Sequence, residues 1–98
     1  MQFLIRAHDG RDMLEKRMSV RPRHLENMMK MKSSVVFGGG ILNEEGKPIG
    51  SAMVMEFESK EQLDAYLASE PYIQEKVWET VEVEPINVVM VNGVKVGK

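Results

Sequence analysis

The feature that most constrains this chain is the order in which strand-like and helix-like patterns follow one another. Four stretches have the alternating or β-branched pattern of strands: "QFLIRAH" (2–8), "SSVVFGGGIL" (33–42), "SAMVMEFE" (51–58) and "WETVEVEPINVVMV" (78–91). Helix signals lie between the first two and between the last two. The order β-α-β-β-α-β is that of the split, ferredoxin-like unit. The sequence therefore predicts an α+β fold with a four-stranded antiparallel sheet and both helices on one face, in a single domain over residues 1–98.

Capping signals place the two helices. Ser19 is a good N-cap and Pro22 suits a first turn, so the first helix is expected to begin near Ser19 and to run to about residue 32. Ser59 and Gln62 form a capping box at the start of the second helix.

The alternation also divides the sheet into two faces. Residues expected under the helices are Phe3, Ile5, Met53, Met55, Phe57, Val81 and Val83. Residues expected on the opposite face are Leu4, Arg6, His8, Ala52, Val54, Glu56, Thr80, Glu82 and Glu84. This second face mixes apolar and ionisable side chains. Either it is the wet side of an antiparallel sheet, or it is shared with a second copy of the chain, with charges paired inside the dimer.

Charge and composition limit the partners of the chain. Acidic and basic residues are interspersed and the formal net charge is -2, whereas nucleic acid rewards a concentrated basic patch. No apolar run approaches the roughly 20 residues that span a bilayer, and no signal-peptide cleavage pattern follows residues 1–8. We therefore expect a cytoplasmic protein that binds neither nucleic acid nor membranes. With 0 cysteines, disulfides, thiolate metal sites and cysteine nucleophiles are excluded.

His24 lies in "RPRHLENMMKM" (21–31), among charges and methionines. At about 100° per residue it falls between Met28 and Met31 on the helical wheel, at one edge of an apolar stripe. A histidine at such a boundary is often satisfied by a single hydrogen bond. It can also act as a general base, because imidazole exchanges its proton near neutral pH.

A general base needs a partner that orients its ring. Three carboxylates are candidates for this role: Glu70, Asp9 and Asp12. Glu70 lies in "SEP" (69–71), which restarts a short helix, and an acid near a helix start is stabilised there in any case. Spacing alone does not choose among the three.

Substrate contacts are predicted from the basic segment "LEKRMSVRPR" (14–23). Arg17 or Arg21 is expected to meet an anionic substrate, although most such charges are simply solvated. The run "GGG" (38–40) has no phosphate-loop pattern, but glycines at a strand end allow a bulge or let a flat ligand lie against the backbone. Two histidines without cysteine and without H-x-x-x-H spacing do not make a zinc pattern. We expect neither a metal nor an organic cofactor.

Taken together, four segments resemble the YciI-like (YCII-related) family. They are "LEKRMSVRPRHL" (14–25), the glycine cluster, "GSAMVMEFES" (50–59) and "SEPYIQEKVWETVEVEP" (69–85). The most specific pieces are the R-P-x-H-L stretch and the tripeptide of an acid followed by Pro and Tyr. The resemblance covers nearly the whole chain. It implies a ferredoxin-like subunit that forms a homodimer, a dimeric α+β barrel.

The resemblance further implies a histidine–acid dyad, which falls on His24 and Glu70, with glutamate in place of the usual aspartate. Tyr72 joins Arg17 and Arg21 as an expected substrate contact, although a tyrosine is more often a core residue. One characterised type in the family resembles a dehydrochlorinase that removes HCl from a chlorinated hydroxyhydroquinone. The implied function is cofactor-free proton abstraction from a small oxygenated ring, a lyase reaction in aromatic degradation. The alternative is a dimeric small-molecule-binding protein without catalysis.

Overall fold

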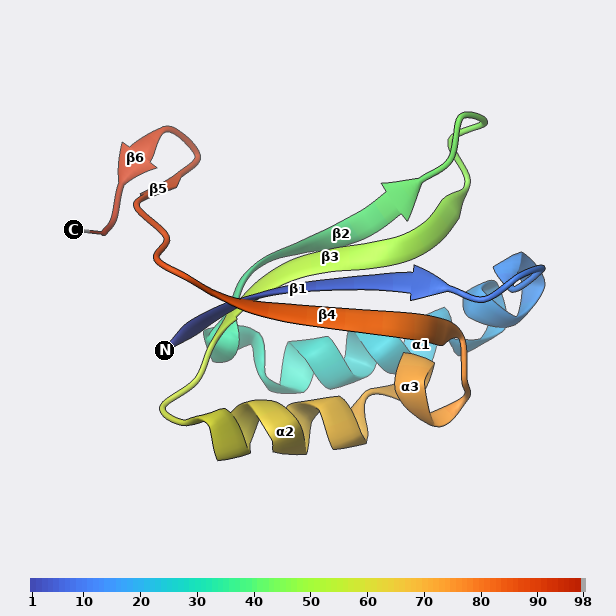
Figure 1. The fold of residues 1–98 in the computed structure, drawn as a ribbon, viewed down its shortest axis with the longest axis horizontal. Helices are drawn as coiled ribbons and strands as arrows, with labels where there is room; N and C mark the ends of the chain where they lie inside the picture. Colours follow the sequence, from blue (N-terminus) through green and yellow to red (C-terminus); the bar gives the residue numbers. More distant parts are fainter. Residues whose placement is uncertain (98) are drawn as a thin grey trace.

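The computed structural model describes residues 1–97 and contains the predicted order of elements. They are β1 (Gln2–Asp9), α1 (Leu14–Lys30), a 3-10 turn (Lys32–Ser34), β2 (Val35–Leu42), β3 (Pro48–Glu56), α2 (Lys60–Ser69), α3 (Pro71–Gln74), β4 (Trp78–Ile86), β5 (Met90–Val91) and β6 (Val94–Lys95). The first four strands form one antiparallel sheet in the order β2-β3-β1-β4. All three helices lie on one face of this sheet (Figure 1). The predicted ferredoxin-like α+β fold is confirmed.

The first helix begins earlier than predicted, at Leu14 instead of near Ser19. The Ser19 hydroxyl donates a hydrogen bond to the carbonyl of Lys16 at 2.7 Å inside the helix, and Pro22 also lies in the helix interior. The added first turn carries Arg17, whose buried side chain ties the turn to the sheet. This tertiary contact outweighs the local capping signal, as is common for weak propensities.

The longer helix changes the place of His24. The side chains of α1 and its C-cap that approach the sheet recur at helical spacing; they are Arg17, Val20, His24, Met28 and Met31. His24 is therefore at the middle of the sheet-facing stripe, and its prediction as an edge residue was wrong. Leu25 and Met29, which directly follow His24 and Met28, are 41% and 64% exposed.

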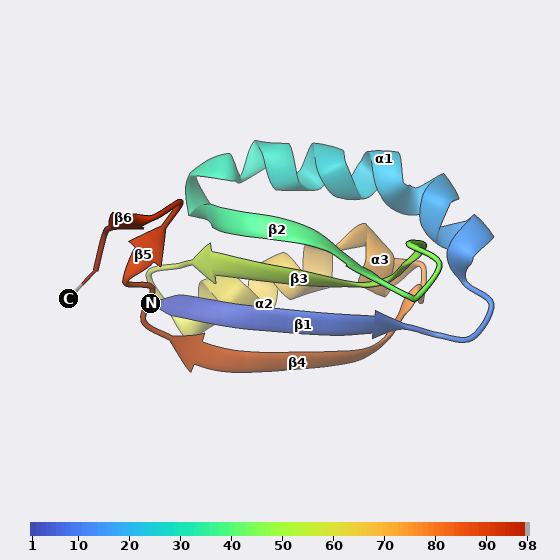
Figure 2. The same cartoon turned by 90° about the horizontal axis from the view of Figure 1, so that it is seen from above.

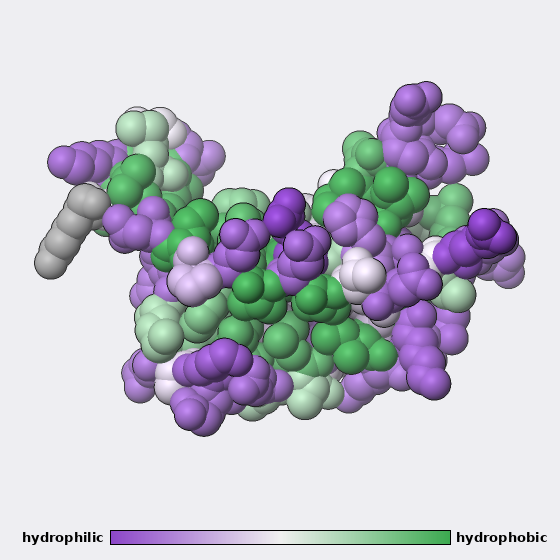
Figure 3. All heavy atoms as spheres, in the orientation of Figure 1, coloured by the Kyte–Doolittle hydropathy of each residue, from purple (hydrophilic) through white to green (hydrophobic). Residues whose placement is uncertain are grey.

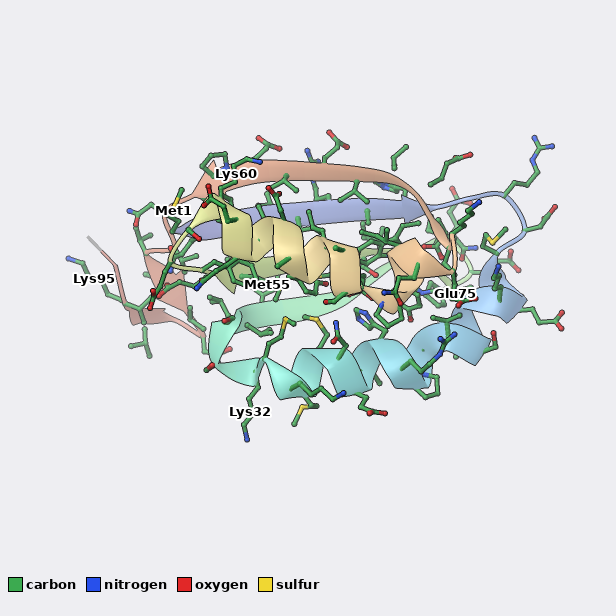
Figure 4. All side chains as sticks on the ribbon, turned by 90° about the horizontal axis from the view of Figure 1, so that it is seen from below. Met1, Lys32, Met55, Lys60, Glu75 and Lys95 are labelled. Carbon is green, nitrogen blue, oxygen red and sulfur yellow. The ribbon has the colours of Figure 1, made fainter. Side chains whose placement is uncertain are left out.

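The core lies between the sheet and the helices. Its buried sheet residues include Phe3, Ile5, Ala7, Met53, Met55 and Phe57. Figure 4 views the molecule from the helical side, with Met55 labelled among these side chains. Val83 is partly buried, whereas Val81 is 37% exposed although it pairs with the buried Ala7. Val81 belongs to an edge strand, which has a neighbour on one side only.

The opposite face of the sheet is open. Arg6 crosses it to pair with Glu84 at 3.0 Å and with Glu82 at 3.7 Å, so these charges already pair within one chain. On the same face, but on the edge strand β2, Phe37 pairs with Val54 and is 51% exposed. Figure 3 shows this side hollowed between the C-terminal hairpin and the β2–β3 hairpin, with apolar side chains on both rims. Figure 2 shows the same face from above.

Candidate active site

The fold brings His24 of α1 beside Glu70, the residue that precedes α3. His24 Nδ1 lies 2.7 Å from Glu70 Oε1, across 46 positions of sequence. The Glu70 side chain is 0% exposed and the His24 side chain is 12% exposed. Of the three candidate carboxylates, Glu70 is thus the one within hydrogen-bonding distance of the imidazole.

Two hydrogen-bond donors besides the His24 ring contact the Glu70 carboxyl group. The Tyr66 hydroxyl donates to Oε2 at 2.5 Å, and the backbone N–H of Tyr72 donates to Oε1 at 3.1 Å, which makes Glu70 the N-cap of α3. Burial, together with the adjacent carboxylate, raises the pKa of Tyr66, so this hydroxyl keeps its proton and acts as a donor. A buried carboxyl group that receives such donors is stable as the acceptor-only carboxylate.

The tautomer of His24 follows from this carboxylate. Because Glu70 accepts, Nδ1 must donate, which leaves Nε2 of the neutral ring as a proton acceptor. Among residues 1–97, Nε2 has no hydrogen-bond partner and is not sealed from solvent, and His24 lines a cavity. The ring is also held by aromatic contacts, stacked on Tyr72 at 4.4 Å between centroids and edge-on to Trp78 at 6.3 Å.

Arg17 binds other side chains of the protein through both terminal nitrogens of its guanidinium group. Its Nη1 donates to Asp9 Oδ1 at 2.8 Å and to Oδ2 at 3.0 Å, while Nη2 donates to Ser51 Oγ at 2.7 Å. The guanidinium also lies over the Tyr72 ring, 4.6 Å from its centroid. Burial raises the pKa of Asp9, and the hydrogen bonds and charge of Arg17 oppose that rise. Asp9 is therefore the partner of Arg17 and not of His24.

The other predicted residues take different positions. Arg21 lines the same cavity, and within residues 1–97 it makes no ion pair and no hydrogen bond, so its guanidinium is available to a ligand. Asp12 lies in the exposed turn before α1, with a φ of 55°, away from His24. Tyr72 is 1% exposed and contributes a wall of the cavity through its ring.

The cavity lies between α1 and the β2–β3 side of the sheet and has a volume of ≈ 450 Å³. That is within the range of about 300–1,000 Å³ usual for small-molecule sites, and about three times the cavity that holds benzene in an engineered protein. Besides Arg17, Arg21 and His24, it is lined mainly by apolar side chains and backbone, including Leu25, Met28, Gly38, Gly40, Leu42, Pro48, Met53 and Tyr72. The arrangement suits a flat ring with polar substituents.

Sequence reasoning missed two of these contacts. Tyr66 was not among the predicted site residues, yet it lies four residues before Glu70, a spacing at which helical side chains meet. Ser51 carries no comparable signal, because strand pairing alone brings it under Arg17. Within residues 1–97, no three carboxylate or histidine side chains gather as metal ligands would, and no helix is long and apolar enough to cross a membrane.

The fold and site define a class: a small ferredoxin-like α+β protein with a histidine, backed by a buried carboxylate, at an open cavity. The chain belongs to the YCII-related domain family, whose family model matches residues 1–87. The predicted membership is confirmed.

Curated relatives agree with this membership. Protein YciI of Escherichia coli O6:H1 and protein YciI of Shigella flexneri are each 36% identical over 93 residues, covering 87% of this chain and 95% of the relative. The aspercryptin biosynthesis cluster protein B of Emericella nidulans is 34% identical over 87 residues. That match covers 80% of this chain but 56% of the fungal protein, so this chain spans about half of its length.

Solved structures agree with the fold. The 5-chloro-2-hydroxyhydroquinone dehydrochlorinase TftG of Burkholderia phenoliruptrix AC1100, in complex with 2,5-dihydroxybenzoquinone, is similar with a TM-score of 0.81 and 24% identity, over 88% of this chain and 93% of TftG. An antibiotic biosynthesis monooxygenase is similar with a TM-score of 0.57 and 9% identity, over 91% of this chain and 98% of that protein. At these identities, the likeness establishes the shared fold.

Proposed function

We propose that this chain is a cofactor-free enzyme of the lyase type, in which His24 Nε2 accepts a proton from a hydroxyl group of a small oxygenated ring. The observation that carries the proposal is the chain of contacts from Tyr66 through Glu70 to His24, which ends at a cavity. These contacts engage Nδ1 and leave Nε2 as the ring nitrogen that can accept a proton. A structural histidine needs one hydrogen bond, whereas this one is oriented by a carboxylate that is itself oriented by a phenol.

The roles of the neighbouring residues follow from their charges. Glu70 stabilises the imidazolium that forms when His24 takes the proton, because its carboxyl group is buried and lies 2.7 Å from His24 Nδ1. Arg21, whose guanidinium is unengaged within residues 1–97, holds the oxyanion that develops on the ring. Positioned proton transfer of this kind contributes roughly 10²–10⁴-fold to a rate.

The most specific form of the reaction is the dehydrochlorination of a chlorinated hydroxyhydroquinone, which the likeness to TftG supports. Two ring hydroxyl groups lose their protons and become carbonyls. The imidazolium of His24 returns one proton to the carbon that bears chlorine, and chloride leaves with the electron pair of the C–Cl bond. One HCl is released in total and a hydroxyquinone remains. Oxidation of the ring is balanced by replacement of C–Cl with C–H, so no external oxidant is required.

We also propose that two copies of the chain associate through the open face of the sheet. Support comes from the half-exposed Phe37 on this face, and from the C-terminal hairpin at its rim, where Met90 and Val94 are 60% and 61% exposed. Apolar side chains gathered on one hollowed face commonly mark an interface between proteins (Figure 3). The site and the open face lie on opposite sides of the sheet, so dimerisation leaves the cavity accessible.

The test of the proposal is turnover of 5-chloro-2-hydroxyhydroquinone, followed by chloride release, in His24→Gln and in His8→Gln. His8 is the matched control because it is exposed on the open face and is the other of the 2 histidines. We expect His24→Gln to lose turnover by about 10²-fold or more and His8→Gln to keep it, with both variants folded by circular dichroism.

Equal turnover in the two variants overturns the mechanism. Saturable binding of the ring with no chloride release, even in the wild type, establishes the alternative of a non-catalytic binding protein.

A further inference from the structure

The cavity owes part of its space to Gly38 and Gly40, two positions in the middle of β2 that carry no side chain. In the sheet register, Gly38 pairs with Met53 and Gly40 pairs with Ser51, and paired residues of an antiparallel sheet share a face. Ser51 has a small side chain, and its hydroxyl accepts a hydrogen bond from Arg17 of α1. Gly38 and Gly40 therefore point toward the helix, across the ≈ 450 Å³ cavity.

Nothing in the described chain requires glycine at these two positions. The glycines with positive φ are Gly46 and Gly93, so the backbone at Gly38 and Gly40 suits any residue. A Cβ at Gly38 would lie 3.6 Å from Met53 Cβ, and a Cβ at Gly40 would lie 3.7 Å from Pro48 Cβ, both ordinary contacts. By contrast, a Cβ at Gly50 would lie 2.4 Å from the carbonyl oxygen of Ala7, which makes glycine necessary there.

Glycine in a strand interior weakens the strand, because it loses more backbone freedom on folding and packs no side chain. Neither conformation nor internal packing offsets that loss at Gly38 and Gly40. The remaining effect of glycine at these two positions is to leave space in the cavity, which His24 and Arg21 also line.

We infer that Gly38 and Gly40 restrict this site to a planar ring, which lies with one face against the bare backbone of β2. This deepens the proposed function and rests on it for the orientation of the ring, with the reacting hydroxyl toward His24 Nε2 and an ionised oxygen toward Arg21. A flat ring can contact a glycine backbone over its whole face, since dispersion contacts are strongest at about 3.5–4.0 Å. A puckered ring of the same size touches the backbone with fewer atoms.

Gly39 supplies a matched control within the same run. Its backbone lines the cavity between those of Gly38 and Gly40, but it pairs with Ala52, so a Cβ at this position points to the other face of the sheet. No atom of residues 1–97 other than its chain neighbours lies within 4 Å of a Cβ built there. Alanine at 38, 39 or 40 is therefore compatible with the fold. Each substitution removes freedom from the unfolded chain, so all three variants should melt at or above the wild-type temperature.

The experiment measures binding of two probes by calorimetry: 2,5-dihydroxybenzoquinone, which is planar, and 2,5-dihydroxycyclohexane-1,4-dione, which carries the same four oxygens on a puckered ring. We expect Gly38→Ala and Gly40→Ala to weaken binding of the planar probe by at least about tenfold, the usual effect of one methyl group in a filled pocket. Gly39→Ala should change it by no more than about twofold, as remote substitutions do. The oligomeric state of Gly39→Ala is measured in parallel, because the added methyl group points to the open face, where the proposed dimer interface lies. The wild type should bind the puckered probe at least about tenfold more weakly.

Three results would overturn the inference: equal effects of alanine at positions 38, 39 and 40, equal affinity of the wild type for the two probes, or no binding of the planar probe to the wild type. Neither probe carries chlorine, so the readout is independent of turnover. If alanine at 38 or 40 weakens binding no more than alanine at 39 does, while the wild type releases chloride, the role of the two glycines is refuted and the proposed reaction stands. If binding is weakened at 38 and 40 only, but the wild type releases no chloride, the role of the two glycines stands and the proposed reaction is refuted.

Discussion

The imidazole of His24 and the carboxylate of Glu70 meet at 2.7 Å, although 46 positions separate them in the chain. The contact lies at the junction of α1 with the start of α3, and the second oxygen of the same carboxylate accepts from the Tyr66 hydroxyl. The histidine is thus the outer member of a chain of hydrogen bonds whose inner members, Glu70 and Tyr66, are 0% and 3% exposed. This relationship leads to the first prediction.

Glu70→Gln keeps the size of the side chain but removes its charge and adds an amide donor. We expect turnover to fall by about 10²-fold or more, because neither the donating state of Nδ1 nor the imidazolium is stabilised any longer. Steady-state kinetics measures the loss, and nitrogen-15 NMR of His24 reports the change of tautomer. Glu70→Asp shortens the side chain by one methylene but keeps the charge, and it should retain more activity than Glu70→Gln. Equal activity of these two variants would show that the charge of Glu70 has no part in the reaction.

Arg17 and Asp9 form a buried ion pair, with side chains 5% and 4% exposed. Arg17→Met leaves the Asp9 carboxyl group buried without its cation, which should lower the free energy of unfolding by about 3–5 kcal/mol. The double variant Arg17→Met with Asp9→Asn should recover part of this loss. Urea denaturation measures both.

The matched control for that prediction is Arg23→Met. Arg23 pairs with Glu75 at 3.5 Å, but on the surface, with side chains 57% and 39% exposed. Exposed pairs contribute about 0–1 kcal/mol, so this variant should unfold almost as the wild type does. A loss of similar size in Arg17→Met and Arg23→Met would contradict the assignment of a structural role to the buried pair.

The 2 tyrosines of the chain make its stability sensitive to alkali. Burial raises the pKa of Tyr66 and of Tyr72 above the ordinary value of 10.0. A group whose pKa is higher in the folded state stabilises that state below the unfolded pKa and loses its contribution as pH rises above it. Above about pH 10, each tyrosine should therefore lower the free energy of unfolding by about 1.4 kcal/mol per pH unit.

Absorbance at 295 nm, recorded together with near-ultraviolet circular dichroism, tests this alkaline transition. Tyrosinate should appear only as the folded signal disappears, and Tyr66→Phe should make stability depend less steeply on pH. Ionisation at an ordinary midpoint in the folded protein would contradict the burial of the two hydroxyl groups.

Phe37 lies on the open face of the sheet, where it pairs in register with Val54 and is 51% exposed. If two copies associate through this face, Phe37→Glu places a charge in the interface and should convert the dimer to a monomer, because a buried unpaired charge is costly. Light scattering on a sizing column measures the mass. Met29→Glu is the control: Met29 is 64% exposed but belongs to α1, on the other side of the sheet, and this variant should remain dimeric. A wild type with the mass of one chain would refute the proposed interface.

The order of elements was predictable from the sequence, because each helix and strand is signalled by local patterns such as alternation and capping residues. Alternation in "QFLIRAH" (2–8) marked β1 and its two faces, and the Ser59 hydroxyl accepts from the N–H of Gln62 as the capping box predicted. The start of α1 was not predictable from Ser19, because a long-range contact of Arg17 added a turn that no local cap announces.

The sequence by itself therefore determined the fold class, the family and the residue types available for chemistry, since periodicity, caps and motif spacing are local properties of the chain. Only the tertiary structure decided that Glu70 and not Asp9 faces His24, that Arg17 is engaged while Arg21 is available within residues 1–97, and that two glycines of β2 open a cavity. The physical reason is that hydrogen bonds act over about 3 Å. Which groups come within that distance depends on how helices and strands far apart in the sequence pack together.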